Sequence, residues 1–335
     1  MQAAIYGLFG TELIPDEAAF FRDARPAGYI LFKRNIESRQ QLRTLTASIR
    51  DLEGHDEVAI LIDQEGGRVA RMRPPEWPAF PSGEAFDKLY ELAPSSAIEA
   101  ARVNARALGL MLHEVGINVD CLPMLDVRQP GATDIVGDRA LGSEPMQVAS
   151  LGKAILEGLR SAGTLGVIKH IPGHGRALVD SHHELPVVDA TEEELTIDLE
   201  PFERLREAPM GMTSHIVYTA WDAERPASQS PFIIQEIIRQ RIGFDGFLMS
   251  DDIGMEALAG DHGQRAAACV AAGCDVALHC DGKMENMLLV ADAVGEISAE
   301  GASRLARAMA MRFTPDDEMD FAEAVAKRDA LLALV

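Results

Sequence analysis

The sequence contains little cysteine, and its spacing excludes the commonest cysteine-based sites. Only four of the 335 residues are cysteines, and no two of them form a C-x-x-C pair: Cys121, Cys269, Cys274 and Cys280. A zinc site built on paired cysteines is therefore disfavoured. The four residues lie in apolar or strand-like surroundings, and we expect buried free thiols, as in a cytoplasmic protein.

Basic residues and long apolar runs are also scarce. There are 31 Lys and Arg against 53 Asp and Glu, which gives a formal net charge of −22. Such a surface repels phosphate backbones and anionic lipid headgroups, so we expect neither a nucleic-acid nor a membrane partner. The N-terminal M-Q-A-A-I-Y-G-L-F-G has no basic region and no long apolar stretch. We therefore expect no signal peptide and no membrane span. We also expect the protein to be a monomer in the cytoplasm.

What the chain does contain is a regular alternation of short apolar runs with helical patterns. Helical periodicity is clearest over Arg39–Leu52, Ser96–Val115, Met146–Ala162, Ile233–Ile242 and Gln264–Ala272. The eight candidate strands are Ala4–Phe9, Gly28–Phe32, Val58–Ile62, Asn118–Leu122, Gly166–His170, Gly211–Ile216, Gly246–Met249 and Asp275–His279. Strand–helix alternation predicts a parallel sheet. Eight repeats favour an α/β fold of the closed (β/α)8 TIM-barrel type over an open doubly wound sheet.

The chain also lacks a Pro/Ser-rich linker, a low-complexity tract and a strong internal repeat. Its hydrophobic content of 47% is ample for one large core. We therefore expect a single TIM-barrel catalytic domain over residues 1–335. Helices within residues 284–335 would complete the barrel and pack against its outside.

Polar side chains gather where the predicted strands end. Asp63 follows the third strand, Asp126 comes shortly after the fourth, and Lys169-His170 ends the fifth. Ser250-Asp251-Asp252 follows the seventh strand in the same way. The carboxyl ends of barrel strands face one mouth, where such enzymes hold their active sites. The sequence therefore predicts a polar site at this mouth.

The segment Lys169–Leu185, K-H-I-P-G-H-G-R-A-L-V-D-S-H-H-E-L, holds four of the nine histidines. Three interpretations of it stay open: a divalent-metal site, histidines that satisfy loop carbonyls, and a general acid/base. Against the metal site, no H-E-x-x-H motif is present, and the neighbours His182 and His183 would tend to diverge. For the acid/base, Asp180 stands two residues before His182, close enough to fix its tautomer and raise its basicity.

Two further groups of charged residues suggest chemistry on a polar substrate. Successive side chains of an extended chain alternate sides, so Asp251 can face the mouth as a nucleophile. Asp252 would then cap a helix that begins near Met255, although capping by both residues remains an alternative. Asp63, Arg71 and Arg139 supply carboxylate and guanidinium groups suited to sugar hydroxyls and other oxygen atoms.

Four long motifs carry a resemblance to a known family: L-I-D-Q-E-G-G-R-V-A-R (Leu61–Arg71), K-H-I-P-G-H-G-R-A-L-V-D-S-H (Lys169–His182), S-H-I-V-Y-T-A-W-D (Ser214–Asp222) and G-F-D-G-F-L-M-S-D-D-I-G-M (Gly243–Met255). In this order the chain resembles the single-domain bacterial β-N-acetylglucosaminidases of glycoside hydrolase family 3, the enzymes of peptidoglycan recycling. One segment departs from the family: Ala140 and Leu141 follow Arg139 where the family usually has R-S-F-G.

The resemblance implies a retaining double displacement, with Asp251 as nucleophile and His182, assisted by Asp180, as acid/base. It further implies that an N-acetylglucosamine ring is held by Asp63, Arg71, Arg139, Lys169 and His170, and that no metal or organic cofactor takes part. The expected substrates are muropeptide sugars such as N-acetylglucosaminyl-1,6-anhydro-N-acetylmuramic acid. The alternatives are a family 3 β-glucosidase, a metal-dependent barrel hydrolase and a sugar-binding barrel without catalysis.

Overall fold

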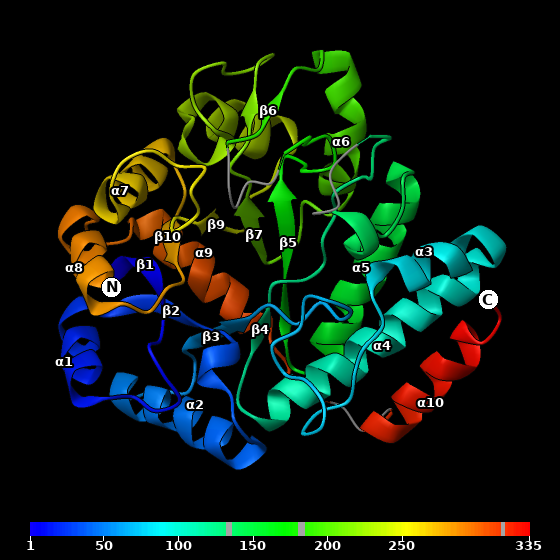
Figure 1. The fold of residues 1–335 in the computed structure, drawn as a ribbon, viewed down its shortest axis with the longest axis horizontal. Coiled ribbons are helices and arrows are strands. Elements are labelled where there is room, and N and C mark those ends of the chain that lie inside the picture. Colours follow the sequence, from blue (N-terminus) through cyan, green and yellow to red (C-terminus); the bar gives the residue numbers. More distant parts are fainter. Residues whose placement is uncertain (132–135, 180–184, 316–318) are drawn as a thin grey trace.

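A closed parallel barrel forms the centre of the molecule (Figure 1). The computed structural model describes residues 1–131, 136–179, 185–315 and 319–335. Within these ranges eight strands lie in the order β1-β2-β3-β4-β5-β7-β9-β10, and β10 pairs with β1. Their bounds are β1 (Gln2–Gly7), β2 (Pro26–Leu31), β3 (Ala59–Ile62), β4 (Val119–Asp120), β5 (Leu165–Ile171), β7 (Met210–Thr213), β9 (Phe247–Asp252) and β10 (Val276–His279). The predicted (β/α)8 barrel is confirmed.

Helices surround this barrel, and the predicted helical segments coincide with five of them. These are α2 (Arg39–Glu53), α4 (Pro94–Glu114), α5 (Pro145–Ser161), the π-helix η4 (Ile233–Arg241) and α7 (His262–Ala272). The other helices are α1 (Pro15–Ala24), α3 (Gly83–Leu92), α6 (Glu192–Arg204), α8 (Met284–Ala293), α9 (Ala299–Ala310) and α10 (Phe321–Leu332). Short β6 (Val187–Val188) and β8 (Val217–Tyr218) pair with each other outside the barrel.

Apolar side chains of the barrel strands divide into two layers with the period of two that a strand imposes. Ile5, Ile30 and Leu61 pack with their counterparts from the other strands inside the barrel. Their neighbours along the chain, such as Tyr29 and Ile60, belong to the larger cluster between the strands and the helices. All four cysteines are buried and free, as expected from the sequence.

The last three helices lie outside the barrel. Helix α8 packs against α7 and β1, and α9 contacts β9. Helix α10 lies farther out, against α4 and α3 (Figure 1). Polar contacts attach this helix and the residues before it: Arg328 Nη1 donates to Asn104 Oδ1 at 3.2 Å, and Arg106 Nε donates to the Met319 carbonyl at 2.8 Å.

Two details of the predicted elements are wrong. Strand β4 pairs over Val119–Asp120 rather than Asn118–Leu122, because the Asn118 amide side chain bonds the β3 backbone and Pro123 offers no N–H. No helix begins near Met255 in this described segment: turns occupy residues 253–258, and the following helix α7 begins at His262, capped by Asp261.

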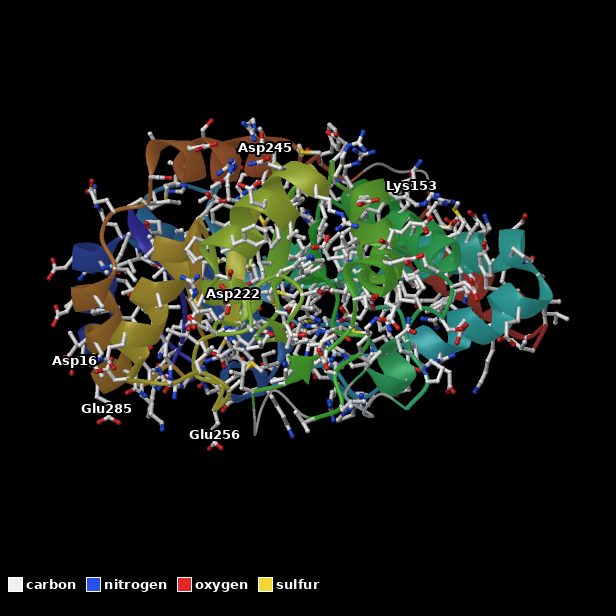
Figure 2. All side chains as sticks on the ribbon, turned by 90° about the horizontal axis from the view of Figure 1, so that it is seen from above. Asp16, Lys153, Asp222, Asp245, Glu256 and Glu285 are labelled. Atoms are coloured by element: carbon white, nitrogen blue, oxygen red, sulfur yellow. The ribbon has the colours of Figure 1, made fainter. Side chains whose placement is uncertain are left out.

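Acidic side chains carry the negative charge at the surface. Asp16 on α1, Glu285 on α8 and Glu256 point outward at the edge of the molecule (Figure 2). Within the described residues, no helix is both long and apolar enough to cross a membrane.

Candidate active site

A pocket of about 240 Å³ opens at the carboxyl ends of the barrel strands. This volume is below the usual range for drug-sized ligands and suits one small polar molecule. The pocket brings together six residues predicted from the sequence to form the site: Asp63, Arg71, Arg139, Lys169, His170 and Asp251. Its wall also contains Phe32, Glu65, Asp126, His174 and Met255. The two remaining predicted residues, Asp180 and His182, lie outside the described residues.

One side of the pocket is a cluster of buried ion pairs. Lys169 Nζ lies 2.9 Å from Asp63 Oδ1 and 2.6 Å from Glu65 Oε1, and the lysine side chain is only 2% exposed. Arg139 forms a bidentate pair with Glu65, with N–O distances of 2.8 and 2.7 Å. Arg71 Nη2 donates to Asp63 Oδ2 at 3.2 Å. The cluster holds charged groups in fixed positions at the pocket wall, ready to hydrogen-bond a polar ligand.

The same cluster keeps its carboxylates ionised. Burial by itself would raise the pKa values of Asp63 and Glu65, but the adjacent cations outweigh it and lower both below their usual range. For Lys169, burial opposes the charge, while Asp63 and Glu65 more than compensate and raise its pKa. Asp63, Glu65 and Lys169 therefore stay charged at neutral pH.

A second polar group is organised around Asp126. This fully buried carboxylate accepts hydrogen bonds from the backbone N–H groups of His170 and His174, at 3.2 and 2.6 Å. Its Oδ2 lies 2.7 Å from His170 Nδ1, which fixes the orientation of that ring and leaves Nε2 for other partners. The His174 ring packs edge-on against His170, with centroids 5.6 Å apart. Asp126 thus ties the end of β5, at His170, to the loop that follows it, at His174.

Asp251 and Asp252 end β9 and have different environments. Burial would raise the pKa of Asp251, but His170, His215 and the Asp252 N–H favour its charged form and lower it. Asp252 instead accepts from the Gly254 and Cys280 N–H groups, and burial with Asp251 beside it raises its pKa to about 6. Asp251 is therefore the more acidic carboxylate of the pair, and Asp252 braces the turn that follows.

His215, two residues after the end of β7, supports the end of β9. It is fully buried, its Nε2 lies 3.0 Å from the Asp252 carbonyl, and its Nδ1 lies 2.7 Å from Ser228 Oγ. With the proton on Nε2, the imidazole donates to the carbonyl and accepts from the hydroxyl. His215 therefore links the segment after β7 to the end of β9 and to Ser228 in the short 3-10 helix Ala227–Gln229.

The sequence places Asp126 near a strand end and Glu65 within the Leu61–Arg71 motif, but it predicts a role for neither residue. A signal for Glu65 was present, since it stands two residues after Asp63 and so on the same side of an extended segment. No comparable signal links Asp126 to His170, which is 44 residues away in the chain.

Burial of His174 gives a testable pH dependence of stability. Burial lowers the pKa of its imidazole to about 4, against about 6.5 for an unfolded histidine. Between these values the unfolded chain binds a proton that the folded chain does not, so the free energy of unfolding falls as the pH drops from 6.5 to 4. This residue contributes up to about 3 kcal/mol to that fall. Urea unfolding of His174→Gln should show a shallower decline than the wild type; parallel curves would contradict the assignment.

Fold and pocket together define the class: a (β/α)8-barrel enzyme whose polar site lies at the carboxyl ends of the strands. The model of the glycosyl hydrolase family 3 N-terminal domain matches residues 13–309. A β-hexosaminidase of Methylococcus capsulatus is 36% identical over 334 residues, which cover 98% of this chain and 94% of the relative. The chain therefore belongs to glycoside hydrolase family 3, and its relatives there are β-hexosaminidases.

Solved structures agree with this assignment. Native NagZ from Neisseria gonorrhoeae superimposes with a TM-score of 0.88 at 30% identity, over 99% of this chain and 98% of the relative. A second NagZ structure from that organism, in complex with N-trifluoroacetyl-D-glucosamine, gives a TM-score of 0.85 at 29% identity, over 99% and 96% of the two chains.

Proposed function

We propose that the protein is a retaining exo-β-N-acetylglucosaminidase. The observation that carries the proposal is the meeting of Asp251 with five sugar-recognition candidates in one pocket at the barrel mouth. Family membership supports it, and so does the neighbour whose structure holds an N-acylglucosamine analogue. The small volume of the pocket suits a single terminal sugar ring and so supports exo action.

In the proposed mechanism, ionised Asp251 attacks the anomeric carbon of the bound sugar. The carbon–oxygen bond to the leaving group breaks as His182, assisted by Asp180, gives a proton to the departing oxygen. A glycosyl–Asp251 ester results. His182, now neutral, then takes a proton from water, which attacks the anomeric carbon and releases Asp251 with retained configuration. An imidazole serves both steps because its ordinary pKa lies near neutrality.

Recognition of the sugar falls to the charged wall. Carboxylate oxygens of Asp63 accept hydrogen bonds from ring hydroxyls, and Arg71, Arg139 and Lys169 donate to them. Each of these groups is already held by a partner of opposite charge, so little side-chain entropy is lost on binding. His170, oriented by Asp126, presents its free ring nitrogen to the same ligand.

For the natural substrates we propose muropeptide sugars with terminal β-N-acetylglucosamine, such as the disaccharide with 1,6-anhydro-N-acetylmuramic acid, with or without its peptide. The family resemblance supports this choice, with peptidoglycan recycling in the cytoplasm as the setting. Release of N-acetylglucosamine from these disaccharides, followed by chromatography of the products, tests it directly. Hydrolysis of aryl β-N-acetylglucosaminides without release of N-acetylglucosamine from the disaccharides would overturn the proposed natural substrates but not the proposed activity.

Selectivity for the acetamido sugar is the first test of the activity. We expect aryl β-N-acetylglucosaminide to exceed aryl β-glucoside by at least about 100-fold in kcat/KM, because buried polar groups left unpaired by the missing acetamido group penalise the glucoside. Values of kcat/KM for the two substrates, measured under the same conditions, test this prediction. Equal rates, or a preference for the glucoside, would favour a β-glucosidase instead.

The role of His182 makes a separate prediction. His182→Ala should slow glycosides with poor leaving groups by about 100-fold or more, because these need a proton on the departing oxygen. Activated aryl glycosides, which leave as stable anions, should be slowed much less in the step that forms the ester. Rates plotted against leaving-group pKa test this. Equal slowing of both classes would contradict the proton-donor role.

A further inference from the structure

A group of metal-ligating side chains lies beside the sugar pocket and outside the mechanism described above. His279 ends β10, Asp281 follows two residues later, and His262 is the first residue of α7. One ligand atom from each residue lies within 4.8 Å of the others. Among the residues that the structure describes, this is the single His/Cys/Asp/Glu group that meets this criterion. None of the three lines the sugar pocket.

The imidazole nitrogens of this group lack the partners that buried polar atoms normally have. His279 is fully buried, and neither of its ring nitrogens has a hydrogen-bond partner. Its Nε2 lies 3.2 Å from Asp281 Oδ1, without hydrogen-bonding geometry. Nδ1 of His262 is likewise buried and unpartnered. A buried polar group without a partner destabilises the folded state, and a bound cation would supply a partner for one nitrogen of each ring.

The donor atoms of the three side chains suit a cation of the zinc class. His279 and His262 each offer an imidazole nitrogen without a hydrogen-bond partner, and Asp281 offers a carboxylate held by the Lys283 N–H and the Asn286 side-chain amide. Two imidazoles and one carboxylate form a ligand set typical of zinc.

We propose that His262, His279 and Asp281 form a binding site for a divalent transition metal of the zinc class. Tetrahedral zinc places its ligand atoms about 3.4 Å apart, since metal–ligand distances are about 2.0–2.2 Å. The 3.2 Å between His279 Nε2 and Asp281 Oδ1 is close to this, and the His262 ligand atom lies within 4.8 Å of the other two, so a small shift of the half-buried His262 ring would complete the set. A water molecule completes the coordination. The Lys283 N–H, 2.8 Å from Asp281 Oδ1, holds the carboxylate in place.

The site would stabilise the segment that follows β10. Cys280, between two of the ligands, lines the sugar pocket, and its N–H donates to Asp252 Oδ1 at 3.2 Å. A metal bound to residues 279 and 281 therefore fixes the backbone that braces Asp252, next to the proposed nucleophile. Its role is structural, because the three ligands stand outside the pocket where the sugar reacts.

Calorimetric titration of the full, metal-stripped chain with zinc tests the proposal. We expect one tight site in the wild type, at least tenfold weaker binding in His279→Gln and in Asp281→Asn, and a zinc-dependent rise of Tm that both variants lose. Asp281→Asn keeps the size of the side chain, so a folding failure of His279→Gln does not decide the result. His55→Gln, at an exposed histidine elsewhere, is the matched control and should bind zinc as the wild type does.

The sugar pocket also contains imidazoles, so a second comparison separates the two locations. The double variant His170→Gln with His182→Gln should keep the tight site. Loss of zinc binding in that double variant, with unchanged binding in the His279 and Asp281 variants, would overturn the proposal. Absence of any tight site in the wild type would overturn it as well. These outcomes do not depend on hydrolase activity.

Discussion

Replacement of Asp251 by asparagine should lower kcat by roughly 10³-fold or more while the fold persists. The carboxylate oxygen that would form the glycosyl ester is gone, and an amide is a far weaker nucleophile. Substrate binding should change much less, because the proposed sugar-binding groups Asp63, Arg71 and Lys169 keep their own ion pairs in the variant. Single-turnover rates with aryl β-N-acetylglucosaminide measure the loss of chemistry. The Tm of the variant shows whether the fold persists.

Asp275 supplies a matched control for that experiment. It is also a buried aspartate, but it bonds the Leu248 N–H, Arg239 and Arg304 away from the pocket. Asp275→Asn should therefore lower Tm while kcat stays within about threefold of the wild type. Near-normal turnover by Asp251→Asn would rule out its role as nucleophile. Comparable losses of kcat in both variants would show that general destabilisation, not chemistry, is being measured.

Replacement of Lys169 by methionine should cause the largest loss of stability. The change leaves Asp63 and Glu65 without the cation that lies within 3 Å of both. Removal of one partner from a buried ion cluster typically costs about 3–5 kcal/mol, because the carboxylates stay desolvated and here keep only one cationic partner each, Arg71 for Asp63 and Arg139 for Glu65. Urea unfolding at neutral pH measures the change in free energy. The loss should shrink below pH 4, where protonation of the two carboxylates removes the repulsion between them.

Lys153 provides the comparison at the surface. It forms an ion pair with Glu157 on α5, 3.9 Å apart, with 69% of the lysine side chain exposed (Figure 2). Lys153→Met should change the free energy of unfolding by less than about 0.5 kcal/mol, since exposed pairs gain little over hydration. If the two variants proved equally stable, the buried cluster would not have the energetic role inferred from its geometry.

The barrel could be predicted from the sequence because its strands are buried on both faces and read as short apolar runs. Their ends were harder to predict. At β4 the Asn118 side-chain oxygen accepts a hydrogen bond from the Ile60 N–H, where a regular strand pair would use a backbone carbonyl. Ile60 lies in the neighbouring strand β3, 58 residues away in the chain. Near Met255 the carboxylate of Asp252 bonds the Cys280 backbone instead of a helix start. This hydrogen bond depends on β10, because Cys280 reaches Asp252 only when β10 pairs with β9.

The candidate site could also be predicted only in part. Residue types at strand ends indicated which side chains would reach the pocket, because all carboxyl ends of a parallel barrel share one face. The pairing among them was not visible. Lys169 bonds Asp63 across 106 residues, and Arg139 bonds Glu65 across 74. Such pairs depend on three-dimensional distances of a few ångströms, which periodicity does not encode.

Trapping of the glycosyl-enzyme tests the central claim, a double displacement at Asp251, most directly. A 5-fluoro-N-acetylglucosaminyl fluoride forms the ester faster than it is hydrolysed, so the intermediate should accumulate. Mass spectrometry of the digested protein should then place one sugar on Asp251, with no adduct in Asp251→Asn. A sugar attached to a different residue, or turnover of natural substrate with inverted configuration and no trapped ester, would contradict the account.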